Sequence, residues 1–326
     1  MSATTVQAGC KKILVAVDFS PHAEAALKQA VWLAQRTGAS ITLAHTLPHL
    51  LPHAEVGAPP PKMRLVTDLL NVSGEGARYQ ALELEMKKEA EAKLRRLVDQ
   101  TASGNNVHLK ILQGEPYIEL IRAVRREEYD LVLAGTRGLA AWEQFLVGST
   151  AKRLIRKCPS TVWVVKAQHA EPPKTVLAAT DFSDASRRAV LEGLSIAREA
   201  GAEFHLLHVI DSLDVPSGLS ERLPADSWLR QAIREEAGER LADFVAYLDA
   251  DSTRIHSHLS PGMPWQGIGR LAKHLHVDLI AMGTVGRGGI KGLLLGNTAE
   301  KVLDTCDCNI LTVKPADFSS PIAPAH

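Results

Sequence analysis

Short apolar runs alternate along the chain with segments in which apolar residues recur at helical spacing. Between the first two runs, Ser20 and Pro21 predict the N-cap and first position of a helix that ends at Gly38. Strands that alternate with helices predict a parallel sheet covered by helices on both faces. In the first half of the chain the runs predict five strands, at Lys12–Asp18, Ser40–His45, Val107–Leu112, Tyr129–Ala134 and Thr161–Val165.

The same pattern is repeated in the second half of the chain. Asp181 ends a run that matches the first strand, and it follows Asp18 by 163 residues. His208 follows His45 by the same 163 residues. A repeat of this length predicts two tandem domains, 1–167 and 173–326, joined by the proline-containing segment 168–173.

The offset between the two copies falls to 148 residues by the third strand, so the first copy carries 15 extra residues. They lie within Pro48–Tyr79, which contains the proline triplet Pro59–Pro61 and is therefore an irregular excursion. Its apolar part, Met63–Leu70, is open to three interpretations: a lid, a partner surface, or a helical turn packed on its own domain.

A glycine loop follows the fourth strand of each copy. In the first copy, Gly135-Thr136-Arg137-Gly138 leads after nine residues to Gly148-Ser149-Thr150 at the start of a helix. Free N–H groups at a helix start form an anion site, and glycines let a flat ring or a phosphate come close. The second copy has Gly283, Gly286 and Gly296 at the same spacing, followed by Asn297 and Thr298. The loops therefore predict two phosphate-binding sites.

Two carboxylates belong to the same prediction. Asp18 and Asp181 end the first strands, where open α/β sheets bind ligands, and each is followed by Phe-Ser, at Phe19 and Phe182. A carboxylate there accepts hydrogen bonds from ribose hydroxyls or an adenine amino group; the alternative is a turn or N-cap aspartate. Arg137 and Arg287 are either phosphate ligands or solvated loop residues.

The second site differs from the first in charge. Lys152 lies in the first turn after Ser149, whereas the second copy has Glu300 after Asn297. The pair Asn297 and Glu300 resembles a capping box, which would occupy the helix-start donors. We therefore expect the first site to bind a polyphosphate more readily than the second.

Composition limits the remaining classes. With 37 basic and 37 acidic residues among 326, the net charge gives no case for a nucleic-acid or membrane partner. No secretory pattern begins the chain, no apolar run spans a bilayer, and four cysteines indicate no disulfide framework, so we expect a cytoplasmic location. The pairs His256/His258 and His274/His276 lack a visible third ligand, so no metal site is predicted, and no catalytic residue is assignable.

The pattern Gly-x2-Gly-x9-Gly-Ser/Thr, with an aspartate ending strand one, resembles the universal stress protein family in its tandem form. Asp18, Gly135, Gly138, Gly148 and Ser149 match its ATP motif, and only Asn297 departs from it in the second copy. The resemblance implies a Rossmann-like α/β fold with strand order 3-2-1-4-5 in each domain and pairing of the two domains through their fifth strands. It also implies that Ala44 or His45 lies near adenine, Ala134 beside the ring, and Ser149 and Thr150 on phosphate. Glutamate at the place of Glu300 is common in the family even among nucleotide binders, which weakens the charge argument.

The function expected on these grounds is a stress-response sensor or scaffold that binds ATP, or AMP or ADP, mainly in the first domain, with Mg²⁺ accompanying ATP. The alternatives are a slow ATPase that uses the first site and a nucleotide-free interaction module. A homodimer of the whole chain is left open.

Overall fold

The computed structural model describes residues 10–49, 75–102, 106–136, 147–211, 228–248, 254–287 and 295–324. The apolar stretch Met63–Leu70 and the proline triplet lie outside the described residues, and so do Arg137 and Gly138.

The first half of the chain builds five parallel strands with helices between them. Along the chain the elements are β1 (Lys12–Ala16), α1 (Pro21–Thr37), β2 (Ser40–Leu47), α3 (Glu75–Thr101), β3 (Val107–Gln113), α4 (Pro116–Glu127), β4 (Leu131–Gly135), α5 (Ser149–Lys157) and β5 (Thr161–Val165). Ser20 caps α1 as predicted, because its side chain accepts a hydrogen bond from the Ala23 N–H, and Gly38 ends the helix at a φ of 74°. The five strands predicted from the apolar runs are confirmed.

After a short 3₁₀ turn, Ala167–His169, the second half repeats the plan. Its elements are β6 (Thr175–Thr180), α6 (Asp184–Ala200), β7 (Glu203–Ile210), α7 (Trp228–Tyr247), β8 (Ile255–Pro261), α8 (Pro264–His274), β9 (Leu279–Gly283), α9 (Asn297–Thr305) and β10 (Asn309–Val313).

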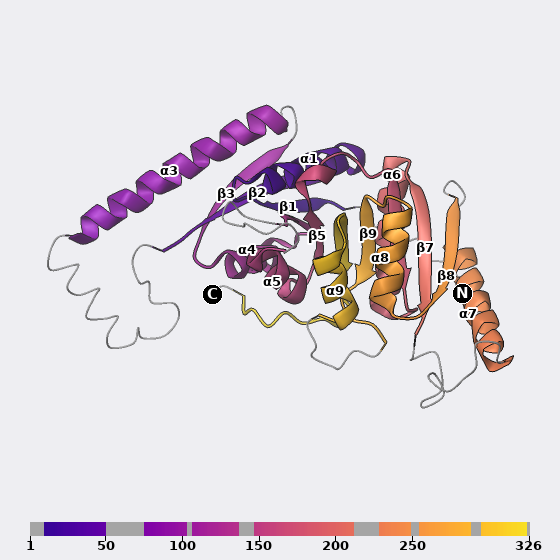
Figure 1. Cartoon of the computed structure of the whole chain (residues 1–326). Helices are drawn as coiled ribbons and strands as arrows, with labels where there is room; N and C mark the ends of the chain where they lie inside the picture. The colour runs from indigo at the N-terminus through magenta and orange to yellow at the C-terminus, as the bar shows by residue number, and fades with distance from the viewer. Residues whose placement is uncertain are drawn as a thin grey trace, which may run out of the picture.

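The two halves share one sheet of ten strands, in the order β3-β2-β1-β4-β5-β10-β9-β6-β7-β8. Neighbouring strands are parallel within each half, whereas β5 and β10 pair antiparallel, with Trp163 opposite Leu311. Figure 1 shows this continuous sheet, with α5 and α9 side by side at its centre. The predicted strand order 3-2-1-4-5 and the pairing through fifth strands are therefore confirmed.

Two apolar layers cover the sheet, and each runs through both halves. One layer joins the strands to α1, α3, α6 and α7, and the other joins them to α4, α5, α8 and α9. Trp163 and Leu311 are both completely buried at the junction. Because burial of large side chains is the main stabilising term in folding, this junction fixes the two halves against each other.

Candidate functional site

The carboxyl ends of β1 and β6 carry the same tight turn. Asp18 Oδ1 accepts hydrogen bonds from Ser20 N (3.0 Å) and Ser20 Oγ (2.6 Å), and Phe19 adopts a φ of 62°. Asp181 and Phe182 repeat this geometry, with the same φ and the same pair of bonds from Ser183. A non-glycine residue at positive φ is strained, so the repeat indicates a turn that the surrounding structure enforces.

A histidine from the next strand supports each turn. The Phe19 ring packs on His45 at 4.6 Å between centroids, and Phe182 packs on His208 at 4.5 Å. His45 Nδ1 lies 2.7 Å from the Val17 carbonyl oxygen. A carbonyl only accepts, so Nδ1 must carry the proton, and Nε2 of the neutral ring is an acceptor.

In both halves, the same backbone hydrogen bond joins the start of the helix after the glycine loop to the residue after the preceding strand. Gly148 N donates to Thr136 O at 2.5 Å, and Gly296 N donates to Thr284 O at 2.7 Å. These bonds place the first turns of α5 and α9 beside the ends of β4 and β9. Neither helix has a side-chain cap.

The first turn of α5 presents unused donors. Within the described part of the chain, the backbone N–H groups of Ser149, Thr150 and Ala151 have no hydrogen-bond acceptor, and the first bond of the turn is Lys152 N to Gly148 O. Such donors, together with the positive end of the helix dipole, attract an anion.

These elements enclose a pocket in the first half with a cavity volume of about 390 Å³. Phe19, which was predicted for this site, does not line the pocket; its ring packs on His45 and on the apolar layer that includes α1 and α3. Ala16, Val17, Thr46, Pro116, Leu120, Thr136 and Ala151 also line it and were not predicted, although the two-residue periodicity of β2 pairs Thr46 with Ala44. The predicted residues that the structure brings together there are Asp18, Ala44, His45, Ala134, Gly135, Gly148, Ser149 and Thr150.

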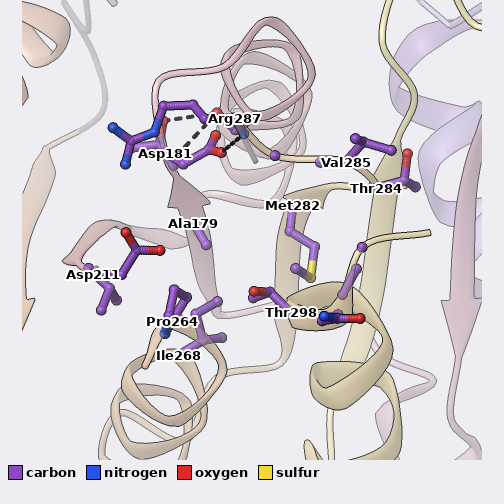
Figure 2. Close-up of a pocket in the computed structure, with 18 of the residues that line it drawn as sticks. Ala179, Asp181, Asp211, Pro264, Ile268, Met282, Thr284, Val285, Arg287 and Thr298 are labelled. Atoms are coloured by element: carbon purple, nitrogen blue, oxygen red, sulfur yellow. Dashed lines mark hydrogen bonds between the residues drawn. The ribbon is translucent and has the colours of Figure 1, made fainter. Parts of the chain in front are cut away.

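A second pocket, of about 290 Å³, occupies the equivalent place in the second half. Figure 2 shows Asp181 at the strand end above it and the Met282 side chain extending into it from β9. Asp181 Oδ2 accepts a hydrogen bond from Arg287 N at 2.6 Å. The residues predicted for this site all line the pocket, namely Asp181, Gly283, Gly286, Gly296, Asn297 and Thr298.

Hydrogen bonding sets the ionisation of Asp181. Burial raises the pKa of this carboxyl, but the bonds from Ser183 and from Arg287 N–H outweigh burial and hold the pKa below its ordinary value. Gly286 lies so close that a Cβ on it would be 2.5 Å from Asp181 Oδ2. The carboxylate therefore holds the start of the second glycine loop against the end of β6.

The strand residues beneath the two pockets differ in size. Ala44 and Ala134 line the first pocket, whereas Leu207 and Met282 stand at the equivalent places in the second. Asp211 adds a carboxylate to the second pocket. This contrast was not predicted from the sequence, because the strand residues Ala44 and Leu207, and Ala134 and Met282, were not compared between the two copies.

The predicted capping box at Asn297 and Glu300 is wrong. Gly296, not Asn297, is the N-cap of α9, and no side chain caps the helix. The Glu300 carboxylate instead accepts from the Arg156 guanidinium of α5, at 2.5 Å. Lys152 likewise pairs with Asp304 of α9, at 2.7 Å. The two charges that distinguished the sites are thus part of the contact between the halves, and the charge argument for a weaker second site fails.

Glycine at 135 and 283 has a packing reason. A Cβ on Gly135 would lie 2.7 Å from His22 Cβ and 2.9 Å from Ala23 N, at the start of α1. A Cβ on Gly283 would lie 2.9 Å from Ser186 N, at the equivalent point of α6. These glycines let a helix approach the strand end. From the sequence, the same glycines were predicted to let a ligand come close.

The described ranges contain no group of three or more His, Cys, Asp or Glu side chains arranged to hold a metal ion. None of their helices combines the length and apolar character needed to cross a bilayer.

Comparison with known proteins places this arrangement in a family. The model of the universal stress protein family matches residues 9–166 and, a second time, residues 173–314. The chain belongs to the universal stress protein family. Universal stress protein E of Salmonella typhi is 31% identical to it over 232 residues, which cover 68% of this chain and 72% of the relative.

Solved structures of the family share the fold. A universal stress protein from Archaeoglobus fulgidus DSM 4304 matches with a TM-score of 0.64 at 19% identity, covering 94% of this chain and 98% of that one. Another universal stress protein has been solved in complex with cAMP; it is 25% identical, with a TM-score of 0.36, and covers 45% of this chain and 100% of that one.

Proposed function

We propose that this universal stress protein binds an adenine nucleotide, held mainly in the pocket of the first half, and acts as a sensor or scaffold whose conformation follows occupancy. The observation that carries the proposal is the first turn of α5. Its N–H donors at Ser149, Thr150 and Ala151 have no acceptor among the described residues. They adjoin the pocket that Ala44 and Ala134 line. Phosphate binds at this kind of helix start, and ATP, ADP or AMP each supplies one.

The rest of the pocket suits a nucleoside. Ala44 and Ala134 leave space for a flat base, and His45 Nε2 is an acceptor of the kind that the adenine amino group matches. Asp18, fixed by Ser20, accepts hydrogen bonds from the ribose hydroxyls or the base. The volume of about 390 Å³ falls within the range of small-molecule pockets.

The second pocket also lies at the start of a helix, but it leaves less space for a nucleotide. Its volume of about 290 Å³ lies at the lower limit for ligand pockets. Leu207 and Met282 reduce the space beneath a base. The preference for the first half therefore rests on the size of the pocket, in place of the charges at Lys152 and Glu300.

The positions of the titratable groups in the first pocket favour nucleotide binding over hydrolysis. Asp18 and His45 are the titratable side chains among the described lining residues of the first pocket, and both are held by hydrogen bonds to the chain itself. A general base must reach the proton that it abstracts, and in the proposed arrangement both groups face the nucleoside whereas the phosphate lies at the start of α5, so neither is expected to reach a water that attacks the phosphate.

The test removes one helix-start donor without disturbing the helix. Ser149→Pro deletes an N–H at the first helical position, where proline is favoured, and Gly148 has the extended ψ of 156° that a residue before proline requires. Loss of a charge-assisted hydrogen bond should weaken ATP binding about 10- to 100-fold in titration calorimetry. Ser149→Ala, which removes only the hydroxyl, is the side-chain control.

Asn297→Pro is the matched variant in the second half, because Gly296 has the same extended backbone, with a ψ of 154°. The proposal expects it to leave the main binding event unchanged. An equal loss in both proline variants would contradict the preference for the first pocket. Absence of ATP, ADP and AMP binding by the unaltered protein would overturn the proposed function.

A further inference from the structure

Two buried lysines link the halves at the ends of α5 and α9. Lys314, directly after β10, is 3% exposed, and its Nζ donates to the carbonyls of Ile155 and Arg156 at the C-terminus of α5. Lys166, directly after β5, is 7% exposed, and its Nζ donates to Cys306 O at 2.6 Å, at the C-terminus of α9. Each half therefore contributes a lysine that caps the last helix of the other half.

These caps lie on the helices whose opposite ends form the two pockets. Ser149 begins α5 at the first pocket and Asn297 begins α9 at the second. The lysines are 148 residues apart, the same spacing as the glycine loops. One short helix thus presents its N-terminus to a candidate phosphate and its C-terminus to a cation from the other half.

Further contacts hold α5 against the second half. Lys152 and Arg156 pair with Asp304 and Glu300 of α9. Ser320 Oγ, in the segment after β10, donates to Lys157 O at 2.7 Å. The end of α5 is therefore fixed by residues of the second half at several points along the helix.

We propose that Lys314 regulates the nucleotide pocket of the first half by coupling it, through α5, to the pairing of the two halves. The inference rests on the proposed function. A phosphate at the N-terminus and an ammonium at the C-terminus are both stabilised by the same helix dipole, and they attract each other. By linkage, nucleotide binding then strengthens the Lys314 contact, and the contact strengthens binding by the same factor.

The size of the effect follows from the length of the helix. Nine residues span about 13 Å, a distance at which screening by salt is already substantial. Coulomb attraction over that distance in a partly buried setting gives about a two- to five-fold change in nucleotide affinity.

The surroundings of Lys314 bring its protonation into the neutral pH range. The Cys158 thiol at the end of α5 is a titratable group near the ammonium, the Phe318 ring lies 4.6 Å from Nζ, and Arg188 of α6 donates to the Lys314 carbonyl. Burial lowers the pKa of Lys314 to about 7. A phosphate at the far end of α5 should therefore increase protonation of Lys314 at neutral pH.

The experiment is calorimetric titration of the full chain with ATP near neutral pH, in buffers of different ionisation enthalpy, so that affinity and proton uptake are both measured. Lys314→Met should weaken binding about two- to five-fold and remove a fraction of a proton of uptake. Lys314→Arg keeps a cation that does not titrate, so it should retain affinity and lose the uptake.

Lys166→Met is the matched control, because it removes the other buried interface lysine, which caps the C-terminus of α9. It should leave both quantities unchanged for the first pocket. The inference is overturned if Lys314→Met binds ATP as the unaltered protein does with the same proton uptake, or if both methionine variants lose affinity equally. Failure of the unaltered protein to bind any adenine nucleotide would refute the proposed function itself, a result distinct from either of these.

Discussion

A close backbone approach beside the first pocket, at Gly135, gives a sharp test of how the pocket is built. In Gly135→Ala the new Cβ would lie 2.7 Å from His22 Cβ, 2.8 Å from His22 C and 2.9 Å from Ala23 N. Two of these atoms belong to the backbone of α1, so the helix start has to move.

The expected cost combines two terms. Overpacking of this kind costs about 1–3 kcal/mol. A shift of His22 also disturbs its Nδ1, which accepts from Ala167 N at 3.0 Å, and loss of such a bond costs about 1 kcal/mol. We therefore expect Gly135→Ala to lower the free energy of unfolding by about 2–4 kcal/mol.

The assay is urea unfolding of the full chain, followed by circular dichroism and tryptophan fluorescence. Gly238→Ala is the control, because a Cβ there meets nothing within 4 Å on helix α7. It should stabilise the protein by up to about 1 kcal/mol, the difference in helix propensity between the two residues. If Gly135→Ala unfolds at the same urea concentration as the unaltered protein, the packing explanation is wrong.

Two further predictions concern charge. Arg156→Glu should lower the free energy of unfolding by only about 0.5–1 kcal/mol, because the Arg156 and Glu300 side chains are 43% and 42% exposed. Arg156→Glu with Glu300→Arg should recover the loss, and an unrecovered loss in scanning calorimetry would show that the pairing is unimportant. The lowered pKa of Asp181 means that its hydrogen bonds stabilise the fold above the ordinary carboxyl pKa and that this stability disappears as the pH falls through the folded-state value. Asp181→Asn should therefore flatten the decline in stability below about pH 4 in urea unfolding, and an unchanged pH profile would contradict the assigned role.

The fold was predictable because two independent patterns agreed. The apolar runs located the strands, and the offsets between Asp18 and Asp181 and between Gly148 and Gly296 showed that the plan occurs twice. Local signals at Ser20 and Gly38 then placed the helix between the first two strands. Pairing of β5 with β10 came from the family resemblance, since apolar runs alone do not specify which strand edges meet.

Tertiary partners explain what sequence reasoning misjudged. Glu300 fits a local capping pattern, but its partner Arg156 is 144 residues away in the chain. Lys166 and Lys314 follow the same repeat as the glycines and were detectable from that spacing. Their role depends on the antiparallel pairing of β5 with β10, which brings each lysine to the other half's helix.

The central claim is that the first pocket holds an adenine nucleotide. Its most direct test is gentle purification of the unaltered chain, acid denaturation, and chromatographic identification of the released nucleotide, quantified per chain. We predict close to one adenine nucleotide per chain, lost in Ser149→Pro and kept in Asn297→Pro. Two nucleotides per chain would contradict the difference between the pockets, and none, even after incubation with ATP, would contradict the central claim.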